Sequence, residues 1–221
     1  MRPHKFARIE RERRFLVDTF PTQDIVRTRH ITDRYQDGTL LRLRRQTDED
    51  RGTVFKLTQK LPTAGGGAQQ GLITTIYLTE PEFGLLSQLP GKMLRKVRYS
   101  VPPLGIDVFE GVLEGLRLAE AEFDSAAEAD AFVPPGFVLH EVTGDVRFTG
   151  GQIVCASRAS LERWLADYGV TLSEPLTPPP PASPAARFGP RCDSPARFRS
   201  RRAPLPPPPR ARPESARPAP P

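Results

Sequence analysis

The sequence predicts a mainly β protein of the α+β class, in which antiparallel strands form a closed sheet with short flanking helices. Apolar and charged residues alternate along many short segments of the first 142 residues, which is the period-2 pattern of half-buried strands. Turn-forming pairs such as Asp37-Gly38 and Pro102-Pro103 separate these segments. A proline-rich and arginine-rich stretch follows the last periodic segment, so the chain divides into a folded body and a tail.

Eight segments carry the alternation, and eight antiparallel strands in succession favour a closed sheet, which leaves no unpaired edge. The predicted strands cover residues 6–17, 39–45, 53–60, 72–78, 93–101, 106–109, 116–123 and 137–142.

Short helices are predicted in the gaps between strands, at residues 22–27, 81–89, 126–132 and 158–168. The last helix is the clearest, because Leu161, Trp164, Leu165 and Tyr168 recur at helical spacing. We interpret this apolar stripe as core packing. The glycine-rich segment 64–68 lacks the Gly-Lys-Ser/Thr ending of a phosphate-binding loop, so we interpret it as a flexible connection between two strands.

The C-terminal residues 173–221 hold 17 of the 26 prolines, and nine arginines against three acidic residues. A stretch with so few large apolar residues cannot bury enough surface to offset the entropy of ordering it. We therefore predict a disordered tail with polyproline II character after a folded domain at residues 1–172. The formal net charge of +6 belongs to this tail, since residues 1–172 carry 23 basic and 23 acidic side chains. The folded part has no excess of positive charge that would indicate a nucleic-acid partner.

Several classes of protein are excluded. No segment approaches the roughly 18 apolar residues of a membrane-spanning helix, and residues 1–14 lack the apolar core of a signal peptide. We therefore expect a cytoplasmic protein with no membrane partner. Cys155 and Cys192 have no metal-ligand spacing, and we expect both as free thiols. Three scattered histidines argue against a zinc site or a histidine-based catalytic triad.

The most informative feature is the charge that each predicted strand carries on one face. In the first strand, Glu10, Glu12 and Arg14 lie two residues apart and project from the same side. The matching face is basic in the next strands and acidic again in the last ones. The basic residues are Arg42, Arg44, Lys56, Lys60, Lys96 and Arg98, and the later acidic residues are Asp107, Glu120 and Glu122.

For a single strand, a solvated outer face would be the ordinary explanation of such charges. The segregation of sign by strand favours a barrel with these faces inward, lined by five carboxylates and seven cations. Such a lining suits a polyphosphate with a divalent metal. Arginine and lysine neutralise phosphate oxygens, and Mg²⁺ prefers carboxylate and phosphate oxygens as ligands. Positioning and charge neutralisation carry most of the catalysis in phosphoryl transfer, so no covalent nucleophile is needed.

These residues resemble a known family. Residues 10–14, Glu-Arg-Glu-Arg-Arg, are similar to the Glu-x-Glu-x-Lys signature that opens the CYTH superfamily, the triphosphate tunnel metalloenzymes. That superfamily includes class IV adenylate cyclases, thiamine triphosphatases and bacterial inorganic triphosphatases. Further motifs match in order over residues 5–168, at 33–35, 41–44, 55–57, 95–99, 106–109, 116–123 and 141–145.

The resemblance implies an eight-stranded antiparallel tunnel barrel that is open at both ends. It also implies that Mg²⁺ or Mn²⁺ is held by Glu10, Glu12, Asp107, Glu120 and Glu122. The implied phosphate-binding residues are Arg42, Arg44, Lys56, Lys96 and Arg98.

Arg14 and Lys56 are the implied catalytic residues. Arg14 stands where the family usually has lysine, and arginine cannot lose its proton to act as a base. Metal-activated water is then the expected nucleophile.

We therefore predict a metal-dependent hydrolase that cleaves a phosphoanhydride bond of a triphosphate, with inorganic triphosphate as the first choice of substrate. Two alternatives stay open. A class IV type adenylate cyclase would use the same charges, but it would also need an apolar pocket for adenine. A non-catalytic module that binds polyphosphate or nucleotide is favoured by Arg14 in place of lysine. The expected partner is a small-molecule triphosphate or polyphosphate, and a homodimer stays open as an assembly.

Overall fold

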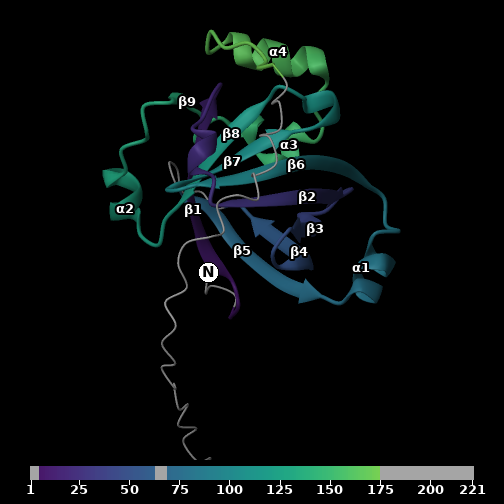
Figure 1. The fold of residues 1–221 in the computed structure, drawn as a ribbon. Coiled ribbons are helices and arrows are strands. Elements are labelled where there is room, and N and C mark those ends of the chain that lie inside the picture. The colour runs from purple at the N-terminus through teal and green to yellow at the C-terminus, as the bar shows by residue number, and fades with distance from the viewer. Residues whose placement is uncertain (1–4, 63–68, 175–221) are drawn as a thin grey trace, which may run out of the picture. The chain divides into compact units, whose positions relative to one another are not determined.

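The computed structural model describes residues 5–62 and 69–174, which form a mainly β fold built on one antiparallel sheet (Figure 1). Nine strands lie within the described residues. They are β1 (Arg8–Val17), β2 (Arg27–Gln36), β3 (Leu41–Asp48), β4 (Gly52–Leu61), β5 (Gln69–Leu78), β6 (Gly91–Val101), β7 (Leu104–Phe109), β8 (Arg117–Glu122) and β9 (Val138–Glu141). Their hydrogen bonding runs in the order β1-β5-β4-β3-β2-β6-β7-β8 and returns from β8 to β1. Eight strands therefore close into a barrel, and β9 is added outside it.

Strand β1 closes the barrel and has three partner strands. Its residues 8–11 pair with β5, residues 12–16 pair with β8, and residues 15–17 pair with β9. The register with β5 shifts between Glu10 and Arg11, which is the signature of a β-bulge. Closure removes the unpaired edges that an open sheet of this size would expose.

The structure confirms the closed eight-stranded barrel but changes which segments form it. The sequence prediction omits β2 and instead counts residues 137–142, which form β9 outside the barrel. The helix predicted at residues 22–27 is wrong, because only the short 3-10 turn η1 (Thr22–Asp24) forms there and β2 begins at Arg27. Strand β2 carries polar side chains on both faces, for example Asp33 inward and Arg34 outward, so hydrophobic alternation does not reveal it.

The other three predicted helices are confirmed as α1 (Glu80–Leu86), α2 (Ala126–Ala131) and α4 (Arg158–Ala166). Each begins after a serine or threonine whose side chain accepts a backbone N–H of the first turn. At α1, Thr79 and Glu82 form a complete capping box. The remaining short elements are η2 (Gly111–Leu113), η3 (Val146–Phe148) and α3 (Gly150–Ile153).

One hydrophobic core lies on the outer face of β1, β7 and β8. Phe15, Ile106 and Ala119 are fully buried there. Helix α2 and the loop after it cover this face, and the ring of Phe132 lies 6.1 Å from that of Phe15 between centroids. This packing holds α2 against the strands that carry several of the acidic residues.

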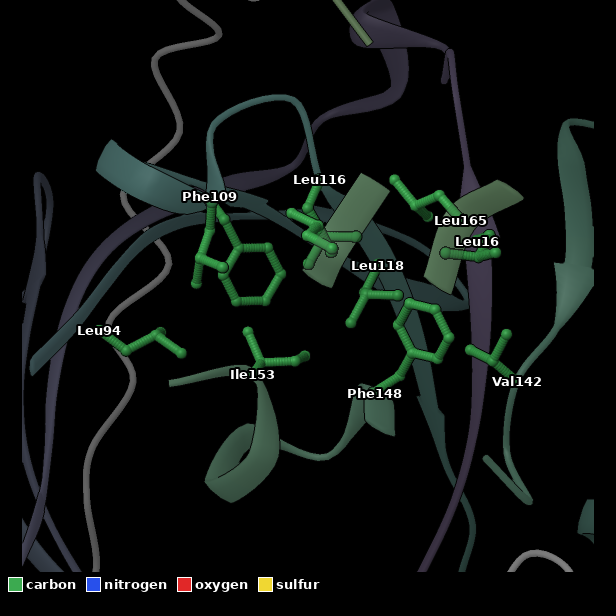
Figure 2. Close-up of a cluster of buried hydrophobic side chains, with 11 residues drawn as sticks. Leu16, Leu94, Phe109, Leu116, Leu118, Val142, Phe148, Ile153 and Leu165 are labelled. Carbon is green, nitrogen blue, oxygen red and sulfur yellow. The ribbon is translucent and has the colours of Figure 1, made fainter. Parts of the chain in front are cut away.

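A second core lies at one end of the barrel interior (Figure 2). Its strand members alternate with the charged residues on the same inward faces. They are Leu16, Leu94, Phe109 and Leu118. Phe148, Ile153 and Leu165 reach them from η3, α3 and α4, as Figure 2 shows. The burial of these large apolar side chains at about 25 cal/mol per Å² is a main source of stability for the barrel.

The segment from Val142 to α4 therefore caps this end of the barrel. Arg14 Nη1 on β1 donates to the carbonyl of Phe148 at 2.9 Å, which ties the cap to the interior. Tyr35 on β2 packs against the same core. The resemblance to the tunnel enzymes implies two open ends, whereas here one end is filled with apolar side chains. The charged end is the one that meets solvent, since Glu122 is exposed and the Lys60 side chain is 43% exposed.

The chain returns along the barrel after α4. Ser173 donates from its backbone N–H to the Gly115 carbonyl at 3.0 Å and from its hydroxyl to Asp18 at 2.7 Å. Arg117 donates to the carbonyl of Glu174. These contacts extend two residues past the predicted start of the tail.

The rest of the predicted tail, including Cys192, and the glycine-rich connection at 64–68 lie outside the described residues. Cys155 is an exposed free thiol. None of the helices in the described part of the chain is long and apolar enough to cross a membrane.

Candidate metal and phosphate site

The barrel interior brings the charged residues of the predicted site onto one continuous face. Residues that pair across neighbouring strands point to the same side of the sheet. Glu12 lies opposite Glu122, and Arg14 lies opposite Glu120, across β1 and β8. Arg44 lies opposite Lys56 across β3 and β4, and Arg98 lies opposite Asp107 across β6 and β7.

Asp33 on β2 organises the two arginines of β3. Arg44 donates from Nε and Nη2 to the two oxygens of Asp33 at 2.6 and 2.7 Å, and Arg42 Nε lies 3.8 Å from Oδ1. The Asp33 side chain is fully buried. Burial alone would raise the pKa of its carboxyl, but Arg44 and Arg42 outweigh this and hold that pKa well below its ordinary value. Asp33 therefore stays ionised and fixes both guanidinium groups.

Asp107 on β7 plays the same part for the cations of β6. Lys96 Nζ donates to Asp107 at 2.5 Å, and Arg98 donates to both of its oxygens at 2.6 and 2.5 Å. Arg98 also donates to Glu120. Burial lowers the pKa of the Lys96 ammonium, although Asp107 opposes that effect. Asp107 and Glu120 are thus paired with cations, and they fix the side chains of two predicted phosphate ligands, Lys96 and Arg98.

Lys56 is the predicted phosphate ligand with the fewest partners. It is half-buried, and its Nζ lies 5.3 Å from the ring centroid of Tyr77, a cation–π contact. No carboxylate of the described residues lies within ion-pair distance of Lys56. Burial lowers its pKa, and the nearby Arg44 and Arg42 lower it further. An anion entering the barrel would relieve this concentration of positive charge.

At the charged end, Lys60 bridges two of the predicted metal ligands. Its Nζ lies 2.7 Å from Glu10 and 3.9 Å from Glu12. Glu12 is buried, and burial together with the charges of Glu120 and Glu10 raises the pKa of its carboxyl to about 7. The ionised form of Glu12 is therefore disfavoured even with Lys60 present, first by burial and then by the neighbouring carboxylates.

Arg14 lies deeper in the interior and makes its contacts to the cap. Besides the Phe148 carbonyl, its guanidinium donates to the carbonyl of Thr143 at 3.4 Å, and its backbone N–H donates to the Thr143 hydroxyl at 3.0 Å. Arg14 Nε lies 3.5 Å from Glu12 Oε1. The arginine that replaces the family lysine thus links the cap to a predicted metal ligand.

The acidic residues of the charged end are of the kind that a hard divalent cation prefers as ligands. Glu10, Glu12 and Glu122 offer carboxylate oxygens at the mouth, and the raised pKa of Glu12 shows that a further positive charge would be favourable there. Among residues 5–62 and 69–174, however, no three acidic, histidine or cysteine side chains converge on one point. Lys60 lies between Glu10 and Glu12, so a metal ion would have to displace its ammonium group.

The sequence alone does not indicate the ion pairs that Asp33 and Lys60 form in the structure. Asp33 belongs to the motif at residues 33–35, and Lys60 shares a strand face with Lys56. The sequence therefore places both residues in the barrel interior without indicating their partners. The partners of these residues depend on which strands are neighbours and in what register, and a single strand does not encode either.

The fold and the interior together define a class of protein. A closed antiparallel barrel of eight strands, with acidic strands beside basic strands on its inward face, is the architecture of the triphosphate tunnel proteins.

Comparison with known proteins identifies the family. The inorganic triphosphatase of Nitrosomonas europaea is 38% identical over 148 residues, which are 63% of this chain and 92% of that protein. The chain therefore belongs to the inorganic triphosphatase family of the CYTH superfamily.

No family model matches the chain. A crystal structure of an inorganic triphosphatase is 28% identical with a TM-score of 0.45, over 66% of this chain and 95% of that chain. A conserved hypothetical protein from Pyrococcus furiosus is 17% identical with a TM-score of 0.39, over 55% of this chain and 83% of that chain.

Proposed function

We propose that this protein hydrolyses a phosphoanhydride bond of inorganic triphosphate in the cytoplasm, with Mg²⁺ or Mn²⁺ as cofactor. The observation that carries the proposal is the set of inward cations fixed by buried carboxylates, in a chain whose relative is an inorganic triphosphatase. The balanced charge of the folded part supports a small-molecule triphosphate as the partner in preference to a nucleic acid.

The arginines of the interior are prepared to bind phosphate before substrate arrives. Asp33 orients Arg42 and Arg44, and Asp107 orients Lys96 and Arg98. Side chains held in this way lose little further entropy on binding, and their charges act in a poorly solvated interior, where they are stronger. We propose that these four residues neutralise the charge that builds up on the triphosphate during cleavage.

Lys56 has a separate role in this proposal. Because it has no carboxylate partner among the described residues, its ammonium group is available to bind phosphate oxygens directly. It acts here as a cationic ligand of the leaving or transferred phosphate.

Glu10, Glu12 and Glu122 would hold the divalent metal, with Glu120 close to them on β8. The bound metal would supply Lewis-acid polarisation of phosphate oxygens and of the attacking water. Glu12 must lose its proton to serve as a ligand, and Lys60 must leave the two carboxylates of β1. We propose that Arg14 positions Glu12 and the cap and takes no proton from water, because a guanidinium group is only a hydrogen-bond donor.

One assay tests this function. Phosphate release from tripolyphosphate, ATP and thiamine triphosphate is measured with Mg²⁺ or Mn²⁺, beside a test for cyclic AMP formed from ATP. We expect the fastest release from tripolyphosphate and no cyclic AMP. Cyclic AMP as the main product would favour the adenylate cyclase. Absence of turnover with any of the three substrates would favour the non-catalytic binding module.

Chelation of the metal gives a second test. We expect excess EDTA to abolish phosphate release and added Mg²⁺ or Mn²⁺ to restore it, because carboxylates at the mouth would otherwise repel a polyanion. Full turnover in excess EDTA would contradict the metal's role.

A further inference from the structure

The outer face of β2, β3 and β6 carries a second group of cations, on the opposite side of the sheet from the charged interior. Thr32 of β2 lies opposite Arg45 of β3 and also opposite Arg95 of β6. Neighbouring strands lie about 4.8 Å apart, so Arg45 and Arg95 flank Thr32 at roughly 10 Å from each other. Arg34 lies two residues further along β2 on the same outward face.

These three arginines line a cavity of about 520 Å³. Helix α1 forms one wall of the cavity through Phe83, whose ring packs against Phe55 of β4 at 4.6 Å between centroids. Leu43 and Met93, from β3 and β6, add apolar lining. The cavity therefore combines a cationic part with an aromatic and apolar part.

The cations of this outer cavity have few acidic neighbours. Glu110 is the acidic residue that lines it. Within the described residues, none of the three arginines lies within ion-pair distance of a carboxylate. On the inner face of the same strands, the cations are instead held by Asp33 and Asp107. The outer cavity thus keeps an excess of positive charge that an anionic ligand would neutralise.

We propose that this outer cavity binds a phosphorylated compound that carries an aromatic ring, such as a nucleoside monophosphate. Guanidinium groups bind phosphate oxygens in a bidentate way, which favours Arg45 and Arg95 as the phosphate ligands. Phe83 offers an aromatic surface on which a base stacks. The volume lies within the roughly 300 to 1,000 Å³ of small-molecule sites. This inference does not depend on the reaction proposed for the barrel interior.

Binding of a fluorescent AMP analogue, mant-AMP, to the full chain tests the proposal by fluorescence anisotropy. We expect the Arg45→Ala/Arg95→Ala double variant to weaken binding at least about tenfold, the scale expected when charge-assisted contacts are lost. Arg51→Ala is the matched control, because Arg51 is an exposed arginine in the β3–β4 turn that does not line the cavity. The affinity of Arg51→Ala for mant-AMP should stay within about twofold of that of the unaltered protein, which is within the usual effect of a surface substitution.

The interior variant Arg44→Ala separates the two sites. It should bind mant-AMP as the unaltered protein does, because Arg44 points into the barrel toward Asp33. Equal binding by the double variant, or loss of binding in Arg44→Ala, would overturn the proposal. So would a dissociation constant weaker than about 1 mM for the unaltered protein, which is the range of non-specific contact.

Competition and a second variant test the aromatic part of the proposal. We expect unlabelled AMP to displace mant-AMP at concentrations where inorganic phosphate does not, and we expect Phe83→Ala to weaken binding. Equal displacement by inorganic phosphate, with no effect of Phe83→Ala, would overturn the assignment of an aromatic ligand. Circular dichroism of each variant confirms that the comparison is made between folded proteins.

Discussion

Two adjacent arginines of β3 serve opposite sides of the barrel wall. Arg44 is fixed by Asp33 in the interior, whereas Arg45 lines the outer cavity. We expect Arg42→Ala and Arg44→Ala each to lower kcat/KM for tripolyphosphate at least about tenfold, the scale of one lost charge-assisted contact. Arg45→Ala should stay near the unaltered rate.

Steady-state kinetics of the three variants, with circular dichroism beside them, make this comparison. The spectra are needed because removal of Arg44 also leaves Asp33 without its main partner in the interior. A loss in Arg45→Ala as large as in the other two would show that the inward assignment is wrong.

The protonation of Glu12 should make the stability of the metal-free protein depend on pH. Its pKa rises from an ordinary 4.5 to about 7 in the folded state. Between these values the folded protein binds more protons at Glu12 than the unfolded chain, so the contribution of Glu12 to stability falls as pH rises through this window. We therefore expect the Tm measured in EDTA to fall as pH rises from about 5 to about 8, because Glu12 becomes ionised.

Thermal melts of the unaltered protein and of Glu12→Gln at both pH values measure this effect. The fall in Tm should be smaller in Glu12→Gln, which cannot ionise at this position. An equally large fall in both proteins would assign the dependence to other groups.

At the scale of elements, the cap is expected to be essential for folding. Phe148 of η3 is 1% exposed and packs among the inward apolar residues of the strands. We expect Phe148→Ala to reduce the free energy of unfolding by about 3 to 5 kcal/mol, the usual cost of removing a buried phenyl group. Val146 belongs to the same short helix but is 70% exposed, so Val146→Ala should change stability by less than about 0.5 kcal/mol. Urea unfolding of both variants compares them, and a similar loss in each would contradict the cap as described.

Much of the barrel lining could be predicted from sequence because a strand's period of two fixes which side chains share a face. Glu10 and Glu12 were found in this way, as were Arg42 and Arg44. The period-2 alternation does not reveal β2, because both faces of that strand are polar. It also does not indicate which residues on different strands are partners. Arg13 illustrates the second limit.

As an outward residue next to the signature, Arg13 looks dispensable in the sequence. In the structure it donates to Glu141 at 2.9 and 2.5 Å and to the carbonyls of Ala129 and Phe132 at 3.1 and 2.7 Å. It joins β1 to β9 and to the region of α2. Contacts between positions more than 100 residues apart in the chain leave no periodic signal in either segment.

At the scale of the whole molecule, the contacts of the described residues extend the body as far as Glu174. A variant that ends at Glu174 should keep the Tm and the turnover of the full chain, since the predicted tail has no core-forming pattern. A variant that ends at Val170 should melt at a lower temperature, because it loses Leu172 from the core and the hydrogen bonds of Ser173 to Gly115 and Asp18.

Melting curves and tripolyphosphate turnover of the two truncated proteins decide the point. A large drop in either quantity for the variant ending at Glu174 would show that later residues bind the body. Equal Tm values for the two truncations would show that residues 171–174 add nothing.

Because the apolar cap fills one end of the barrel, the charged end is the single route into its interior that the described residues leave. In a barrel open at both ends, a reaction product can leave at one end while the next substrate enters at the other. Here both would pass the charged end near Lys60 and Glu122. Phosphate or pyrophosphate still held by the interior cations would block an arriving triphosphate. With the function proposed above, accumulated product should therefore inhibit competitively, and product-inhibition kinetics with tripolyphosphate would measure this.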